Sequence, residues 1–127
     1  MSRARLCAAT LATVAFAAVV GAAGAPAEPA QRATPKVTVA DDFFAPDFVK
    51  VKKGKKVNFV WDDFNINPHN VTLGSTKPKG VKKSDFKSRT GAVNLDFKPK
   101  FKKAGKYGFV CTIHRTVMKM TVQVKKN

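Results

Sequence analysis

The chain has few of the side chains that bind metals or perform acid–base chemistry. Its 127 residues contain only two histidines, His69 and His114, and two cysteines, Cys7 and Cys111. Acidic residues are also scarce, because 8 Asp and Glu face 24 Lys and Arg. No long segment keeps the 3.6-residue period of an amphipathic helix, which argues against a helical bundle. Two cysteines are too few for a disulfide-rich scaffold, and without Cys7 the three remaining Cys and His residues would be one short of a four-ligand structural zinc site.

The amino-terminal residues have the features of a secretory signal peptide. Arg3 and Arg5 precede an uncharged, alanine-rich run over 6–20, and Ala25-Pro26-Ala27 offers a cleavage site between small residues. We predict a signal peptide over 1–27, a flexible leader over 28–35 and one domain over 36–127. An uncleaved anchor over 6–24 is the alternative. Either way, the domain is expected outside the cytoplasm, in the periplasm, the cell envelope or the extracellular space.

Signal cleavage would leave Cys111 as the only cysteine. A lone thiol in an oxidising compartment requires another role than a disulfide, and metal binding is the role we favour over a buried, inert cysteine.

The positive charge limits the partners of the chain. Without Arg3 and Arg5, 22 basic residues face 8 acidic ones, a net charge of +14. This balance favours acidic proteins or anionic lipid and polymer surfaces, although a merely solubilising surface is equally compatible with it. Nucleic acid is not expected, because 3 arginines against 19 lysines are poorly suited to reading bases.

From residue 36 onward, apolar residues alternate with polar ones. Seven short runs with a period of two, separated by Gly, Pro, Asn and Asp, predict an all-β, antiparallel sandwich of about 100 residues, with at most a helical turn near 84–88. The runs are Val37/Val39, Val49/Val51, Val57/Phe59/Trp61, Val71/Leu73, Val93/Leu95/Phe97, Tyr107/Phe109/Cys111 and Met118/Met120/Val122/Val124.

The candidate metal ligands are His69, Cys111, His114 and Met118. Two imidazoles, a thiolate and a thioether are the donor set of a mononuclear blue-copper site, with Met as a weak axial ligand. Alternation places Cys111 on the same face as buried Phe109, and it puts Met118 nearest the loop and Met120 deeper in the core. A catalytic Cys/His pair is the enzyme alternative, but neither a helix N-terminus nor a third orienting residue is apparent. We therefore expect no enzymatic activity.

The chain resembles the cupredoxins, the group of plastocyanin, pseudoazurin, amicyanin and azurin, over about 36–126. The resemblance lies in Phe44-Ala-Pro46 to Phe59, in Pro68-His69-Asn70-Val71 and in Gly105-Lys-Tyr107-Gly-Phe109-Val-Cys111-Thr-Ile-His114. It implies a Greek-key β-sandwich of seven to eight strands that binds one copper ion through His69, Cys111, His114 and axial Met118. It also implies that Asn70 joins the ligand loops by hydrogen bonds. The Cys-x2-His spacing is similar to plastocyanin and amicyanin, whereas His-x3-Met is similar to azurin.

The function that we expect is an exported, monomeric blue-copper protein that shuttles single electrons between Cu(I) and Cu(II). The alternative is a protein that stores or delivers copper. The resemblance implies an exposed edge of His114, which apolar Ile113 and Val117 would surround. Arg115 and the lysines would steer an acidic redox partner toward that edge.

Overall fold

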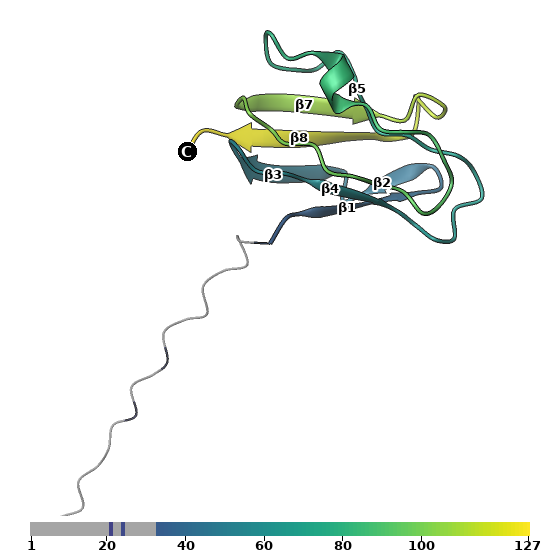
Figure 1. Cartoon of the computed structure of the whole chain (residues 1–127), viewed down its shortest axis with the longest axis horizontal. Helices are drawn as coiled ribbons and strands as arrows, with labels where there is room; N and C mark the ends of the chain where they lie inside the picture. The colour runs from purple at the N-terminus through teal and green to yellow at the C-terminus, as the bar shows by residue number, and fades with distance from the viewer. Residues whose placement is uncertain (1–20, 22–23, 25–32) are drawn as a thin grey trace, which may run out of the picture.

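The computed structural model of the protein describes residues 21, 24 and 33–127. Most of the predicted signal peptide and most of the predicted leader lie outside the described residues. The rest forms two four-stranded sheets packed face to face (Figure 1). One sheet has the order β2 (Phe43–Ala45), β1 (Lys36–Ala40), β4 (Asn58–Trp61) and β6 (Asp96–Phe97). The other has the order β3 (Phe48–Lys52), β8 (Lys119–Lys125), β7 (Gly105–Val110) and β5 (Thr72–Leu73).

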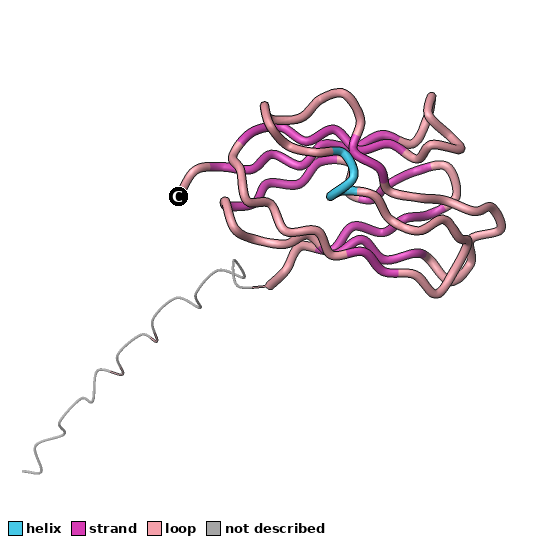
Figure 2. The backbone as a smooth tube through the Cα atoms, turned by 45° about the horizontal axis from the view of Figure 1, so that its top comes forward, coloured by secondary structure: helices cyan, strands magenta, loops and turns pink. Residues whose placement is uncertain are grey.

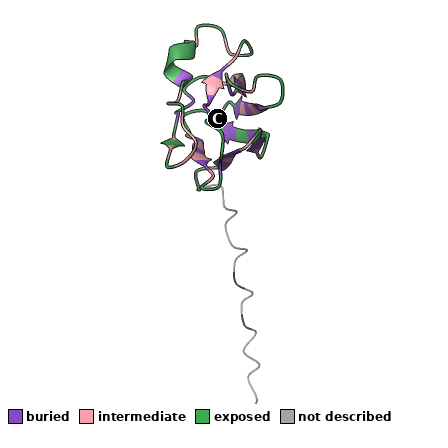
Figure 3. Cartoon of the chain, turned by 90° about the vertical axis from the view of Figure 1, so that its right-hand side faces the viewer, coloured by how far each residue is buried: buried purple, intermediate pink, exposed green. Residues whose placement is uncertain are grey.

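Alternation of apolar and polar residues gives each strand one buried face. In β3, Val49 and Val51 are buried between exposed neighbours, and in β8 the buried residues Met120, Val122 and Val124 alternate with half-buried or exposed ones. Because successive side chains point to opposite faces of a strand, these residues meet between the two sheets. Figure 3 shows buried residues gathered on the strands and exposed residues mainly in the loops between them.

Aromatic rings fill much of the core. Phe109 is fully buried and lies 5.4 Å from Phe59, measured between ring centroids. Phe86 comes from the single-turn 3-10 helix Lys83–Phe86, which covers one side of the sandwich (Figure 2) and brings this ring to 5.3 Å from both Phe101 and Tyr107. Such tilted ring pairs add to the stability that the buried apolar area gives.

The predicted all-β sandwich and the short helical turn are confirmed, with three differences. β2 was missed, because a three-residue strand is too short to show a period. The expected run from Val93 to Phe97 forms a strand only at Asp96–Phe97. Two strand pairs, β1 with β4 and β3 with β8, are parallel and not antiparallel. The chain crosses from one sheet to the other after each strand from β2 to β6, so strands that run in the same direction become neighbours, and the alternation of side chains carries no information on this.

The sandwich has two distinct ends. β1 and β7 finish, and β8 begins, at what we call the ligand end, on the right in Figure 1. β3 and β8 finish, and β1, β4 and β7 begin, at the opposite end, near the carboxyl terminus. None of the described residues forms a helix with the length and hydropathy needed to cross a bilayer.

Candidate metal centre

Three of the predicted ligands meet at the ligand end. The potential ligand atoms of His69, Cys111 and His114 all lie within 4.8 Å of one another. His69 comes from the loop between β4 and β5, Cys111 follows β7 directly, and His114 lies in the turn before β8. Cys111 and His69 are fully buried, whereas the His114 side chain keeps 23% of its surface exposed.

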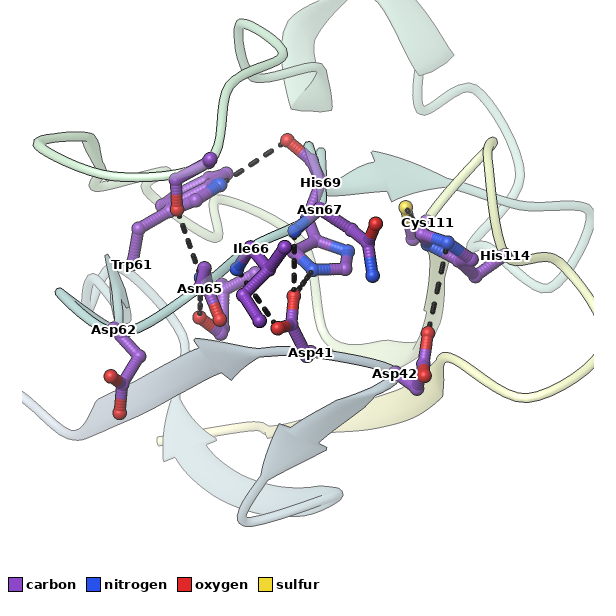
Figure 4. A network of polar contacts seen from close by, with 12 residues as sticks. Asp41, Asp42, Trp61, Asp62, Asn65, Ile66, Asn67, His69, Cys111 and His114 are labelled. Atoms are coloured by element: carbon purple, nitrogen blue, oxygen red, sulfur yellow. Dashed lines mark hydrogen bonds and ion pairs between the residues drawn. The ribbon is translucent and has the colours of Figure 1, made fainter.

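The orientation of His69 is fixed by Asp41, the residue directly after β1. Nε2 of His69 lies 2.7 Å from Oδ1 of Asp41 (Figure 4). An ionised carboxylate can only accept a hydrogen bond, so Nε2 carries the proton and Nδ1 keeps a free lone pair. Nδ1 is buried without any hydrogen-bond partner among the described residues. A buried polar atom without a partner is costly, and a metal ion bound at this nitrogen would remove that cost.

The same carboxylate organises the loop that carries His69. The backbone N–H of Ile66 donates to Asp41 Oδ2 at 2.9 Å, and that of Asn67 donates to Oδ1 at 3.1 Å. The hydrogen bond from the Ile66 amide, followed by that from His69, lowers the pKa of Asp41 from 3.8 to about 2. Asp41 therefore remains ionised at neutral pH and holds the loop and the imidazole together.

His114 has a similar arrangement with the next residue of the chain, Asp42. Its Nε2 lies 3.7 Å from Oδ1 of Asp42, and its Nδ1 lies 3.7 Å from Sγ of Cys111 (Figure 4). Asp42 has a left-handed backbone (φ 67°), which Asp tolerates better than most residues and which suits the tight turn between β1 and β2. Adjacent carboxylates thus lie beside the two histidines, each on the side of Nε2.

Asn70 connects the two ligand loops through Thr112. The Asn70 amide group donates to Thr112 Oγ1 at 2.7 Å, and the Thr112 backbone N–H donates to Asn70 Oδ1 at 2.9 Å. Asn70 also donates to Thr90 Oγ1 at 3.0 Å. Because Asn70 follows His69 and Thr112 follows Cys111, these bonds fix the spacing of both ligands.

Further hydrogen bonds hold the backbone of His69. Its carbonyl oxygen accepts one from Trp61 Nε1 at 3.2 Å, and its N–H donates to the Gly91 carbonyl at 2.9 Å. The amide of Asn65 joins the same loop to the carbonyls of Val39 and Ala92. The position of His69 is therefore set by several independent segments.

Met118 and Met120 are both buried, but they lie in different places. Met118 precedes β8, donates from its N–H to the His114 carbonyl at 2.9 Å and accepts from the Cys111 N–H at 3.1 Å. Met120 lies within β8, where it pairs with Phe109. Met118 therefore closes the loop that carries Cys111 and His114.

The residues predicted to dock a partner are all exposed at the ligand end. Arg115 lies between Ile113 and Val117, which keep 48% and 61% of their surface exposed. Sequence reasoning missed Phe64 and Ile66, which are almost fully exposed in the neighbouring loop after β4. Both are apolar residues in a polar segment that fits no strand, and this pattern could have indicated that they are exposed.

Asp41 and Asp42 were also missed as contacts of the histidines. Their signal was an adjacent pair of acids at the end of an alternating run in a lysine-rich chain. The pattern could not show which histidines they would meet, because His69 lies 28 residues from Asp41.

The donor set of this site fits copper. Thiolate and imidazole ligands together favour copper or zinc over calcium, magnesium and manganese, and the candidate thioether of Met118 adds a preference for copper. The sandwich holds three of these residues on two loops, and the Nδ1 of His69, which has no hydrogen-bond partner among the described residues, is available to a metal.

The fold and the site define a small β-sandwich metalloprotein. Residues 34–125 match the family model of copper binding proteins, the plastocyanin/azurin family. The chain belongs to this family, and its His69, Cys111 and His114 are positioned to hold one metal ion. A search of curated protein sequences found no match.

Solved structures share the fold. A purple cupredoxin from Nitrosopumilus maritimus is 20% identical, with a TM-score of 0.59, and the match covers 72% of this chain and 99% of that protein. The reduced state of an amicyanin mutant is 22% identical, with a TM-score of 0.59 and coverage of 74% and 84%. A copper-containing nitrite reductase from Thermus scotoductus is 22% identical, with a TM-score of 0.62. This match covers 75% of our chain but only 23% of the reductase.

Proposed function

We propose that the protein is an exported type 1 copper protein that carries single electrons between redox proteins. The observation that carries this proposal is the cluster of His69, Cys111 and His114, in which the buried Nδ1 of His69 has no hydrogen-bond partner within the described part of the chain. Copper bound there would supply a one-electron couple between Cu(I) and Cu(II). The hydrogen bonds of Asp41, Asn70 and Trp61 support a carrier role, because ligands held this firmly would move little between oxidation states.

Met118 is our candidate for the fourth, axial ligand. It is fully buried, and its backbone is hydrogen-bonded to both Cys111 and His114. In blue-copper sites a weak axial ligand tunes the reduction potential. Met120, which pairs with Phe109 inside β8, is assigned to the core.

Electrons would enter and leave through the exposed edge of His114. Apolar Ile113 and Val117 flank this edge and allow a partner to approach without a large desolvation cost, while Phe64 and Ile66 offer more apolar surface close by. Arg115 and the net charge of the domain favour an acidic partner through long-range steering. Contacts of this kind suit brief encounters of a monomeric carrier outside the cytoplasm.

Visible and EPR spectra of the copper-loaded protein test the assignment. We expect an intense thiolate-to-Cu(II) absorption, which Cys111→Ser should abolish while the far-UV circular dichroism of the β-sandwich persists. Cys7→Ser changes the other cysteine, in the predicted signal peptide, and should leave the colour intact. A colourless wild-type protein with an ordinary tetragonal Cu(II) EPR spectrum would exclude a type 1 site.

Copper delivery predicts a different result. A delivery protein would hold Cu(I) preferentially and pass it quickly to a competing Cu(I) chelator. A carrier should complete repeated cycles of oxidation and reduction without losing copper. Loss of copper to the chelator within a few cycles would favour delivery over electron transfer.

A further inference from the structure

Five lysines surround one depression at the end of the sandwich opposite the metal centre. The depression has a volume of about 500 Å³, and Pro78, Ala104 and Asn127 complete its lining. Its lysines are Lys53, Lys79, Lys102, Lys103 and Lys126, which we call the lysine pole. They come from four separate segments of the chain, so the fold and not the sequence brings them together.

These lysines lack neutralising partners within the described part of the chain. Lys98, outside the pole, pairs with Asp96 at 3.2 Å, and no other lysine of residues 33–127 has a carboxylate side chain from that range within ion-pair distance. Lys103 donates instead to the Lys79 carbonyl at 3.1 Å, which holds the two sides of the depression together. The pole is therefore a region of uncompensated positive charge.

The carboxylates are concentrated at the other end. Asp41 and Asp42 lie in the turn after β1, and Asp62 and Asp63 follow β4, all at the ligand end. No Asp or Glu side chain of residues 33–127 lines the depression. The domain is thus electrically polarised along its strands, with the metal centre at the less basic end.

β8 connects the two ends directly. It begins after Met118 and finishes before Lys126, and its seven residues span about 23 Å. The chain also enters the domain near the pole, because the Pro35 carbonyl accepts a hydrogen bond from Asn58 at the start of β4. Figure 1 shows the amino-terminal end of β1 and the carboxyl terminus at the same end of the sandwich. The first strand therefore starts at the same end of the sandwich as the pole.

We propose that the lysine pole docks the protein on the surface of an anionic lipid bilayer. Clustered lysines are attracted to anionic headgroups without requiring a fixed geometry. Neither Arg89 nor Arg115, the arginines of residues 33–127, lines the depression, and arginine is the residue suited to bidentate recognition of a single phosphate. The large apolar side chains exposed in the described part are Phe43, Phe48, Phe64, Ile66, Ile113 and Val117, and none lines the depression. The contact is accordingly electrostatic and peripheral.

Docking through this end would orient the metal centre. With the pole on the lipid, the exposed edge of His114 points away from the bilayer. Its distance from the lipid surface is then about the length of β8. A redox partner could then reach Ile113 and Val117 while the carrier remains at the membrane. The lipid interaction itself does not depend on copper, so it can be tested whether or not the proposed electron-transfer function is correct.

Vesicle co-sedimentation with the full chain tests the proposal. One variant replaces the five pole lysines with glutamine, and a control variant with the same net charge replaces five exposed lysines elsewhere, Lys50, Lys82, Lys83, Lys87 and Lys119. On vesicles of equal parts phosphatidylglycerol and phosphatidylcholine, the pole variant should bind at least about tenfold more weakly than wild type, and the control less than about threefold. Binding to pure phosphatidylcholine should be the same for all three proteins, since any contribution from the predicted signal region is shared.

Three results would overturn the proposal. Equal loss in both variants would mean that only net charge matters. Equal binding of the wild type to both kinds of vesicle would mean that the bilayer is not recognised by charge. Displacement by millimolar inorganic phosphate at constant ionic strength would identify a small-anion site. Circular dichroism of each variant confirms that the comparison is made between folded proteins.

Hydrogen exchange measured by mass spectrometry tests the orientation without copper. On anionic vesicles, amides of 53–56 and 102–104 should exchange at least about threefold more slowly, whereas those of 112–117 should be unchanged. Protection of 112–117 would place the ligand end on the lipid and contradict the proposed orientation.

Discussion

The carboxylate of Asp41 lies 2.7 Å from Nε2 of His69, a residue 28 positions away. This contact determines which nitrogen of His69 faces Cys111 and His114, because a protonated Nε2 leaves Nδ1 free for a metal. It also places a negative charge next to a candidate ligand. The same oxygen atoms accept two backbone hydrogen bonds, so the charge is held in a fixed position.

Asp41→Asn should raise the reduction potential of the copper-loaded protein. The carboxylate stabilises the more positively charged oxidised state, so its loss should favour Cu(I) and raise the potential by about 60 mV, which is about tenfold in the one-electron equilibrium constant. Voltammetry measures the shift. Asp85→Asn, which removes a carboxylate from the 3-10 helix, is the control and should change the potential little. An unchanged potential in Asp41→Asn would show that the charge of Asp41 does not tune the copper and that this residue only holds the His69 loop in place.

The metal-free protein should lose stability in acid in part through Asp41. Folding lowers the pKa of this group from 3.8 to about 2. Its contribution to the free energy of unfolding is therefore complete above about pH 4 and is lost as the pH falls toward 2. Urea unfolding across this range should give a shallower pH dependence for Asp41→Asn than for the wild type. Equal slopes in the two proteins would contradict the contribution assigned to Asp41.

The two methionines should respond differently to substitution by leucine. If Met118 is the axial ligand, Met118→Leu should change the absorption spectrum and the potential of the copper protein. Met120→Leu conserves volume within the core and should cost less than about 1.5 kcal/mol of stability, with little spectral change. A larger spectral effect from Met120→Leu would mean that the assignment of the two residues is reversed.

Electron transfer with an acidic redox protein should slow as the salt concentration rises. Screening acts over about 8 Å at physiological ionic strength and reduces the association rate of opposite charges. Arg115→Glu should slow the bimolecular rate more than Lys87→Glu, which makes the same change of charge away from the ligand loop. Stopped-flow absorption measures these rates. A faster reaction with a basic partner at low salt would instead indicate that the carboxylates near the metal centre, such as Asp42, govern docking.

Much of the fold could be predicted from local patterns. The alternation of Val49 and Val51, or of Val122 and Val124, defines a buried face of a strand without any knowledge of its neighbours. The parallel pairing of β3 with β8 could not be predicted in this way. It depends on the path that the chain takes between the sheets, and the side-chain period is the same for parallel and antiparallel neighbours.

The sequence by itself determined the class of site, because His69, Cys111 and His114 are nearly the whole supply of soft and borderline ligands in the predicted domain. Their chemistry is a property of the residue types and can be read without coordinates. Only the tertiary structure decided that Asp41 and Asp42 would lie beside the two histidines, and that five distant lysines would gather at the opposite end. Such contacts depend on which turns and loops the packed sheets bring to the same end of the domain. Residues far apart in the chain carry no local sequence signal that they will lie close together in space.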